Sequence, residues 1–236
     1  MDIEQFRYAD DNLGYLVYTA KQGIAIDAGN PEAISGFARD RGIEIKYVTN
    51  THSHQDHTFG NRMLLKKTRA AGALFLDCRS LDQGQVIELD GGQGLEVMLT
   101  PGHTADSVCF KGPGFVVTGD TLFNATVGNC FSGDLEGFYR SLKQLMELPG
   151  ETLVYAGHDY VEESLAVAES IEPENSDIRV YRDTYSREPV VSCMADELKV
   201  NPYLRFNAPS MIRRLEEKDM PRETGSQRFA SLMEIY

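Results

Sequence analysis

The stretch Thr51-His52-Ser53-His54-Gln55-Asp56-His57 decides the fold of this chain. It follows an alternating apolar and polar run, residues 43–49, that predicts a β-strand. His52 and His54 are two residues apart on extended backbone, so their rings project to the same side, as two ligands of one ion require. Asp56 and His57 come after the chain begins to turn toward a helix, so they can face a second ion.

The remaining histidines follow predicted strands in the same way. His103 follows the run 95–99, His158 follows the run 152–155, and Asp120 follows the run 115–117. If these strands lie side by side, their ends converge on one edge of a sheet. The side chains that then meet are His52, His54, Asp56, His57, His103, Asp120 and His158. Imidazole and carboxylate ligands without a nearby thiolate suit zinc, iron or manganese and argue against a structural cysteine-rich zinc site.

The composition excludes several classes of protein. A length of 236 residues allows one large domain, or a large and a small one, and 42% hydrophobic residues are typical of a globular chain. The formal net charge of -13 opposes binding to nucleic acid and to anionic membranes. The first residues do not read as a secretory signal, no apolar run is long enough to span a membrane, and four dispersed cysteines suit a reducing compartment. We therefore expect a cytoplasmic protein, and the oligomeric state stays open.

The predicted secondary structure changes near residue 162. Before it, short β-type runs alternate with turns, and after it helical patterns are separated by prolines. We expect a first domain of residues 1–165 and a helical domain of residues 166–236. Further strands are predicted at 13–18, 23–27 and 108–110. Helices are predicted at 31–41, 59–71, 135–147, 164–171, 192–199, 210–217 and 226–235, with serines capping helices of the last group.

The HxHxDH stretch resembles the metallo-β-lactamase fold superfamily, and its glyoxalase II (hydroxyacylglutathione hydrolase) branch most closely. The segments Pro101-Gly102-His103-Thr104, Gly119-Asp120-Thr121-Leu122-Phe123 and Ala156-Gly157-His158-Asp159-Tyr160 carry the same resemblance, which runs from about residue 12 to 177. Asn201-Pro202-Tyr203-Leu204-Arg205 is similar to the NPFLR segment of that family's helical domain. The resemblance implies an α+β fold, in which an αββα sandwich is followed by a small helical substrate-binding domain.

The resemblance also implies a dinuclear metal site. One ion would be bound by His52, His54 and His103, and the other by Asp56, His57 and His158, with Asp120 bridging them. Two adjacent divalent ions lower the pKa of a shared water to about 7, so a hydroxide nucleophile exists without a separate base. The activity implied is hydrolysis of the thioester of a small thiol, with Asp120 as the bridging carboxylate and Asp56 also orienting the hydroxide.

The substrate-binding segment departs from the family pattern. The family holds glutathione with a basic residue and an aromatic hydroxyl in a GKFY-like or GRFF-like segment, where this chain has Gly128-Asn129-Cys130-Phe131. Asn129 and Phe131 therefore occupy the matching positions, while Tyr160 matches the tyrosine of the family's GHEY motif. The terminal stretch 228–236 is basic only at Arg228. A thioesterase for a thiol other than glutathione is therefore an alternative.

Two further interpretations remain open. Mono-iron persulfide dioxygenases share the HxHxDH motif and an AHDY-like segment, and one bound iron with oxygen uptake would favour that activity. A non-catalytic binding protein on the same scaffold would bind no metal. The helical tail and the retention of every metal-ligand position favour the thioester hydrolase.

Overall fold

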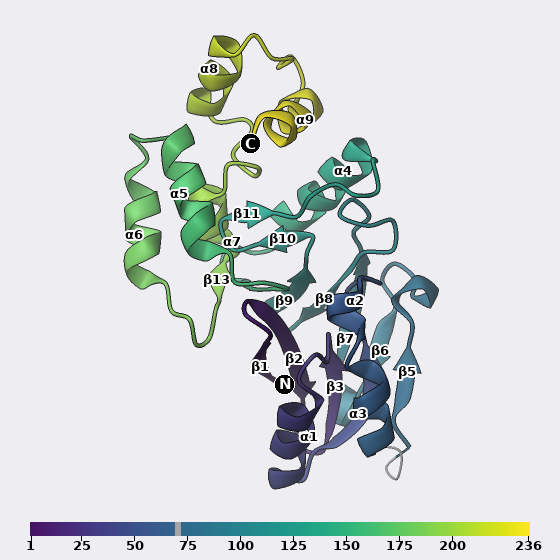
Figure 1. The fold of residues 1–236 in the computed structure, drawn as a ribbon. Helices are drawn as coiled ribbons and strands as arrows, with labels where there is room; N and C mark the ends of the chain where they lie inside the picture. The colour runs from purple at the N-terminus through teal and green to yellow at the C-terminus, as the bar shows by residue number, and fades with distance from the viewer. Residues whose placement is uncertain (69–71) are drawn as a thin grey trace.

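Two β-sheets stacked face to face form the centre of the molecule in the described residues, 1–68 and 72–236 of the computed structural model (Figure 1). The first sheet has the order β1-β2-β3-β4-β5 and the second β13-β12-β9-β8-β7-β6. The pairs β3/β4, β4/β5 and β9/β12 are parallel, and the other pairs are antiparallel. The first sheet's strands are β1 (Asp2–Tyr8), β2 (Asn12–Tyr18), β3 (Gln22–Ile26), β4 (Glu44–Thr49) and β5 (Leu74–Leu76). The others are β6 (Val86–Glu88), β7 (Gly94–Leu99), β8 (Val108–Gly112), β9 (Phe115–Gly119), β12 (Leu153–Ala156) and β13 (Ser192–Cys193), with a separate hairpin of β10 (Leu122–Phe123) and β11 (Thr126–Val127).

The core between the sheets follows from the two-residue period of a strand. Leu13, Tyr15 and Val17 of β2 point inward and pack with Val97 and Phe110 of the second sheet. Leu16, between them in sequence, faces the opposite way and joins a separate cluster. Because both faces of β2 are covered, its residues form a nearly continuous apolar run.

Helices cover the outer face of each sheet. On the first sheet, Ile34 of α1 (Pro31–Asp40) and Leu64 of α3 (Asn61–Thr68) pack with Leu16. On the second, Phe138 and Leu142 of α4 (Leu135–Met146) pack with strand residues in a third cluster. The short helix α2 (Gln55–Thr58) follows β4. The αββα sandwich predicted from the sequence is confirmed.

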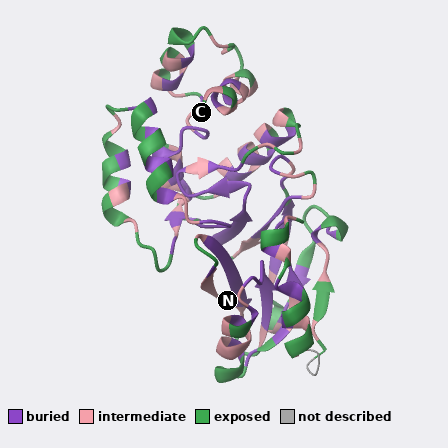
Figure 2. Cartoon of the chain, in the orientation of Figure 1, coloured by how far each residue is buried: buried purple, intermediate pink, exposed green. Residues whose placement is uncertain are grey.

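The last part of the chain adds helices along one side of this sandwich (Figure 1). Phe229 of the final helix stacks edge-on against Phe138 of α4, with ring centroids 5.7 Å apart. Figure 2 shows that these helices are buried toward the sheets and exposed on their outer faces. In the described part of the chain no helix combines the length and the apolar character needed to cross a bilayer. The helices are α5 (Val161–Ile171), α6 (Ser176–Thr184), α7 (Met194–Val200), α8 (Pro209–Glu217) and α9 (Gly225–Ile235).

Several sequence predictions need correction. The helix expected at 192–199 begins as β13, because Ser192 and Cys193 pair with β12, and only then continues as α7. Strand β1 and helix α6 were not expected. Serines do not cap α5, α7, α8 or α9; Thr224 caps α9 in a capping box with Gln227. The helix expected at 59–71 is α3, and residues 69–71 of that prediction lie outside the described residues. The domain boundary after residue 165 stays a prediction.

Candidate metal centre

The side chains expected to meet at the sheet edge do meet there. Each follows a strand of the sandwich: His52 comes after β4, His103 after β7, Asp120 after β9 and His158 after β12. His54 is the N-cap residue of α2, which carries Asp56 and His57. They form two groups, in each of which the metal-binding atoms lie within 4.8 Å of one another. The groups are His52, His54, His103 and Asp120, and Asp56, His57 and His158.

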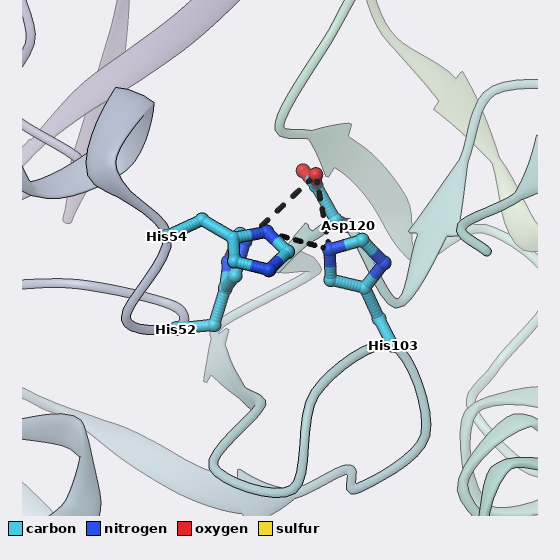
Figure 3. Close-up of side chains that lie close together, drawn as sticks. All are labelled: His52, His54, His103 and Asp120. Carbon is cyan, nitrogen blue, oxygen red and sulfur yellow. Dashed lines mark hydrogen bonds and ion pairs between the residues drawn. The ribbon is translucent and has the colours of Figure 1, made fainter. Parts of the chain in front are cut away.

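The first group is closed around one point (Figure 3). Nε2 of His103 lies 3.1 Å from Nδ1 of His54 and 3.5 Å from Oδ2 of Asp120. Nε2 of His52 lies 3.9 Å from the same oxygen. Three imidazole nitrogens and a carboxylate oxygen therefore face one another from three different loops.

The second group lies directly beside the first. Nε2 of His57 is 3.2 Å from Nε2 of His158, and Oδ2 of Asp56 is 3.5 and 3.4 Å from these two nitrogens. Asp120 reaches this group as well: its Oδ1 lies 3.3 Å from Nε2 of His57, and its Oδ2 lies 3.5 Å from Nε2 of His158. Asp120 is therefore the carboxylate shared by both groups.

The outward nitrogens of the imidazoles are held by hydrogen bonds that fix which nitrogen faces the centre. Nδ1 of His103 donates to the backbone oxygen of Asn129 at 2.9 Å. A carbonyl oxygen only accepts, so Nδ1 carries the proton and Nε2 presents a lone pair. Nδ1 of His57 lies 3.0 Å from Oδ2 of Asp27, and Nδ1 of His158 lies 2.9 Å from Oδ1 of Asp11. These contacts also leave Nε2 free to bind a metal.

Burial and charge set the protonation states of the centre. Burial lowers the pKa of His52 to about 4, and it also lowers the pKa of His103. Burial opposes charge on Asp120, but the imidazoles of His158 and His57, which face this carboxylate, outweigh burial and hold its pKa well below its usual range. For His57, burial lowers the pKa, but the carboxylates of Asp27 and Asp120 outweigh it and raise the pKa well above its usual value. The centre therefore favours positive charge near His57 and Asp120.

These residues fit a divalent metal. Nε2 of His52 and Oδ1 of Asp120 are buried, and neither has a hydrogen-bond partner among the described residues. Nε2 of His57 and Nε2 of His158 point at each other, while their Nδ1 atoms face carboxylates. Two ring nitrogens that face each other and buried polar atoms without a partner are unfavourable, and a cation between them removes both penalties. Nitrogen and carboxylate donors suit zinc, iron or manganese.

Sequence reasoning missed the residues that support the ligands. Asp27 comes directly after β3, just as His52, His103 and His158 come after their strands. This position could have identified it as part of the site. Asn12 donates from Nδ2 to Oδ2 of Asp56 at 3.1 Å. Gly157 allows close packing, since a Cβ there would lie 2.2 Å from Oδ1 of Asp120. Asp11 and Asn12 come just before the predicted strand 13–18, and no local pattern identified them.

The expected substrate residues lie around the rim of the centre. Tyr160 is stacked on His158 with ring centroids 4.9 Å apart, and burial raises its pKa to about 12, so its hydroxyl stays protonated at neutral pH. Phe131 is 67% exposed, and its ring lies 5.6 Å from that of His54 and 5.3 Å from that of His103. Asn129 is exposed beside it. Whether these residues touch substrate stays a prediction.

Family models match the two parts of the chain. The model described as the metallo-beta-lactamase superfamily matches residues 9–77 and 70–158. The model described as the hydroxyacylglutathione hydrolase C-terminus matches residues 159–235. The solved structure of ETHE1 from Myxococcus xanthus covers 100% of this chain and 91% of its own, with a TM-score of 0.71 and 22% identity. TTHA1623 in a di-iron-bound form covers 86% and 100%, with a TM-score of 0.60 and 24% identity. These structural likenesses show the fold.

Relatives that match over most of their length identify the branch. A hydroxyacylglutathione hydrolase from Polaromonas sp. is 35% identical over 246 residues, which cover 95% of this chain and 94% of that protein. A protein of the same name from Methylobacillus flagellatus is 33% identical and covers 86% of each. Together with the fold and the paired histidine groups, these matches show that the chain belongs to the hydroxyacylglutathione hydrolase family of the metallo-beta-lactamase superfamily.

Proposed function

We propose that the chain is a hydrolase of small-thiol thioesters that works with two divalent metal ions. Its family membership supports the reaction class. The position of Asp120 carries the dinuclear part of the proposal. This carboxylate lies 3.5 Å from His103 in one group and 3.3 Å from His57 in the other, so one side chain can hold two ions side by side.

The proposed ligands divide as the groups do. His52, His54 and His103 would hold one ion, Asp56, His57 and His158 the other, and Asp120 would bridge them. Such a pair of ions would lower the pKa of a shared water to about 7 and polarise the thioester carbonyl. Asp11, Asp27 and the carbonyl of Asn129 keep the imidazole rings in the orientation that binding requires.

Asp56 has a second proposed role in handling the proton of the attacking water. Burial raises its pKa, but His57 and the hydrogen bond from Asn12 outweigh it, so the pKa is lower than usual and the group is ionised at neutral pH. Its side chain is 48% exposed, which leaves it accessible to water. Asn12 fixes the carboxylate at 3.1 Å, so its free lone pairs can accept a hydrogen from water and orient the oxygen.

The departing group needs no protein acid in this proposal. A thiol ionises near pH 8.5, far more readily than an alcohol or an amine, so a thiolate can leave unprotonated. Every histidine of the chain lies in the metal groups, and none is left to activate a serine or cysteine nucleophile. The attacking group is therefore water.

The test combines metal analysis with thioester hydrolysis. We expect two ions per chain, drawn from zinc, iron and manganese, and release of free thiol from a panel of thioesters. His103→Ala and Asp120→Ala should each abolish turnover, because each removes a donor from the shared centre. Full activity in either variant, with its metal content unchanged, would refute the proposal.

The same experiment separates the other candidate activity. A mono-iron persulfide dioxygenase would bind one iron and consume oxygen with a persulfide, and the complete second group of Asp56, His57 and His158 favours the hydrolase instead. We also propose a cytoplasmic location, which the free thiols of all four cysteines support. A disulfide between any two of them in protein isolated from cells would contradict it.

A further inference from the structure

An open cleft of about 800 Å³ begins at the rim of the metal centre. One wall is the loop of Asn129, Cys130 and Phe131, and the other is the face of α9 with Ala230, Met233 and Glu234. Phe131 connects the cleft to the centre, because its ring lies beside the rings of His54 and His103. Asn129 also connects the cleft with the metal centre, since it lines the cleft and its backbone oxygen accepts a hydrogen bond from Nδ1 of His103. A molecule bound at the centre can extend directly into this cleft.

The charge of the cleft is negative. None of the described residues that line it is lysine or arginine, and Glu234 is a carboxylate on its wall. The smaller opening on the other side of the centre is lined by Asp56 with Ala9, Asn12, Gln55 and Phe59, and it has no basic side chain among the described residues either. Neither opening therefore offers a cation to a carboxylate on the substrate.

Arg222 and Arg228, which follow the lining residues Pro221 and Gln227 in the sequence, are held away from the cleft by other hydrogen bonds. Arg228 donates to the backbone oxygens of Arg222 and Glu223 at 2.8 and 3.2 Å, and it also binds the side chain of Asn207. Arg222 donates to the backbone oxygen of Met220 and to the carboxylate of Glu216, at 3.2 Å each. A change of side-chain direction toward the cleft would break these hydrogen bonds.

We propose that this cleft binds the thiol carrier of the substrate and selects a carrier that has an uncharged or cationic group there over one that ends in a carboxylate. The proposal rests on the thioester hydrolase activity proposed above. The cleft is larger than the second opening, of about 370 Å³, so the bulkier part of the thioester belongs in it. Its apolar side chains, Phe131, Met233 and Ala230, bind the stem of the carrier, and Glu234 repels an anionic end.

The test uses two thioesters that differ at one group. One is a 2-hydroxyacyl thioester of glutathione, and the other is the same compound with the glycine carboxylate converted to a carboxamide. The metal-loaded enzyme should give about tenfold higher kcat/KM with the carboxamide at low salt, through KM rather than kcat. Added salt should reduce the difference, because exposed charges are screened.

Binding of thioether analogues tests the cleft without catalysis. The thioethers of glutathione and of its carboxamide cannot be hydrolysed, so their Kd values report recognition alone. We expect a lower Kd for the carboxamide. An equal or higher Kd for it, or no measurable binding of either analogue, would overturn the inference. If neither thioester is hydrolysed, the proposed function is contradicted. The ratio of the two Kd values would still show whether the cleft discriminates between the two carriers.

Substitutions of cleft residues test whether the discrimination between the two thioesters arises in the cleft. Glu234→Gln should raise kcat/KM for the carboxylate thioester by about threefold, and Asn129→Lys should lower its KM by more, because it adds a cation on the opposite wall. Gln93→Lys is the matched control, since it makes the same change in charge at an exposed position before β7, while His103 follows the far end of that strand. If Gln93→Lys lowers KM as much as Asn129→Lys, the discrimination arises from net charge and the cleft has no part in it.

Discussion

Oδ2 of Asp27 lies 3.0 Å from Nδ1 of His57, and both side chains are fully buried. The same carboxylate accepts hydrogen bonds from the backbone nitrogen and the hydroxyl of Thr51, at 2.8 and 2.7 Å. One acid thus ties the end of β3 to the loop that carries the HxHxDH motif. It also turns Nε2 of His57 toward the second group of ligands.

Replacing Asp27 by asparagine should therefore weaken one metal site selectively. A side-chain amide would accept fewer hydrogen bonds than the carboxylate and would not favour the Nδ1 proton of His57, so the affinity for the second ion should fall by about 10- to 100-fold. We expect Asp27→Asn to retain one ion per chain after dialysis where the parent protein retains two. Metal analysis and competition with a chelator measure this, and thermal unfolding checks that the fold is intact.

An exposed acid provides the control for this change. Asp82→Asn removes the same charge from a surface position, so it should leave the metal content unchanged. Two tightly held ions in Asp27→Asn, at parental affinity, would show that the orientation of His57 does not depend on Asp27.

Gly157 should be intolerant of any side chain. A Cβ at this position would lie 2.2 Å from Oδ1 of Asp120 and 2.9 Å from the ring of His57. Gly157→Ala should displace the shared carboxylate, and we expect loss of metal and a fall in activity of at least about 100-fold. Gly36→Ala is the matched control. Gly36 lies within α1, where the nearest side-chain atom would be 3.8 Å from the added Cβ, so the substitution should stabilise the fold by up to about 1 kcal/mol and leave activity unchanged. Parental metal content in Gly157→Ala would be inconsistent with a rigid Asp120.

Phe131 is exposed in a way that suits contact with a ligand. The residue is 67% exposed beside two histidines, so removal of its ring empties no core. Phe131→Ala should change the free energy of unfolding by less than about 0.5 kcal/mol. It should raise KM for a thioester by about fivefold with little change in kcat, because aromatic contacts contribute about 1 kcal/mol. Steady-state kinetics and urea unfolding on the same samples decide the matter, and an unchanged KM would remove Phe131 from the substrate site.

The grouping of the candidate metal ligands could be predicted from the sequence because its signals are local. His52, His103, Asp120 and His158 each follow a short strand whose apolar or alternating pattern is visible in the sequence, so the rule that strand ends converge was enough to bring them together. The αββα layers followed from the family resemblance, and the two sheets with their outer helices agree with it.

The rest depends on contacts between distant segments. Asn12 forms a hydrogen bond with Asp56, and Asp11 forms one with His158. These pairs are far apart in the sequence, and no spacing reveals them. Residues 192 and 193 form a strand only because β12 offers them an edge. Strand β1 was missed because its residues are mostly half-buried at the edge of the first sheet, so it lacks a strong apolar pattern.

The ion pair between Glu172 and Arg205 gives a prediction about how stability depends on pH. Glu172 is 4% exposed and accepts two hydrogen bonds from the guanidinium of Arg205, at 2.6 and 2.9 Å. Ser210 donates to it as well. Burial raises the pKa of Glu172, but these hydrogen bonds outweigh burial, so the pKa lies below its usual value of 4.5. The ionised pair therefore stabilises the fold above that pH, and the stabilisation is lost as the pH falls through the pKa of the folded state.

Glu172→Gln should consequently be destabilising at neutral pH and much less so in acid. At pH 7 the variant leaves the guanidinium of Arg205 without its counter-ion, which should lower the free energy of unfolding by about 2 kcal/mol. As the pH falls through the lowered pKa of Glu172 in the folded state, the parent protein becomes protonated there and resembles the variant, so the two values should converge. Urea unfolding of both proteins in identical buffers measures the difference, and any acid loss of metal is common to both and cancels. Glu174→Gln, at an exposed position two residues away, should change the value by less than about 0.5 kcal/mol at pH 7. If the difference in the free energy of unfolding between the parent and Glu172→Gln stays constant from neutral pH into acid, the ionised pair does not cause that difference.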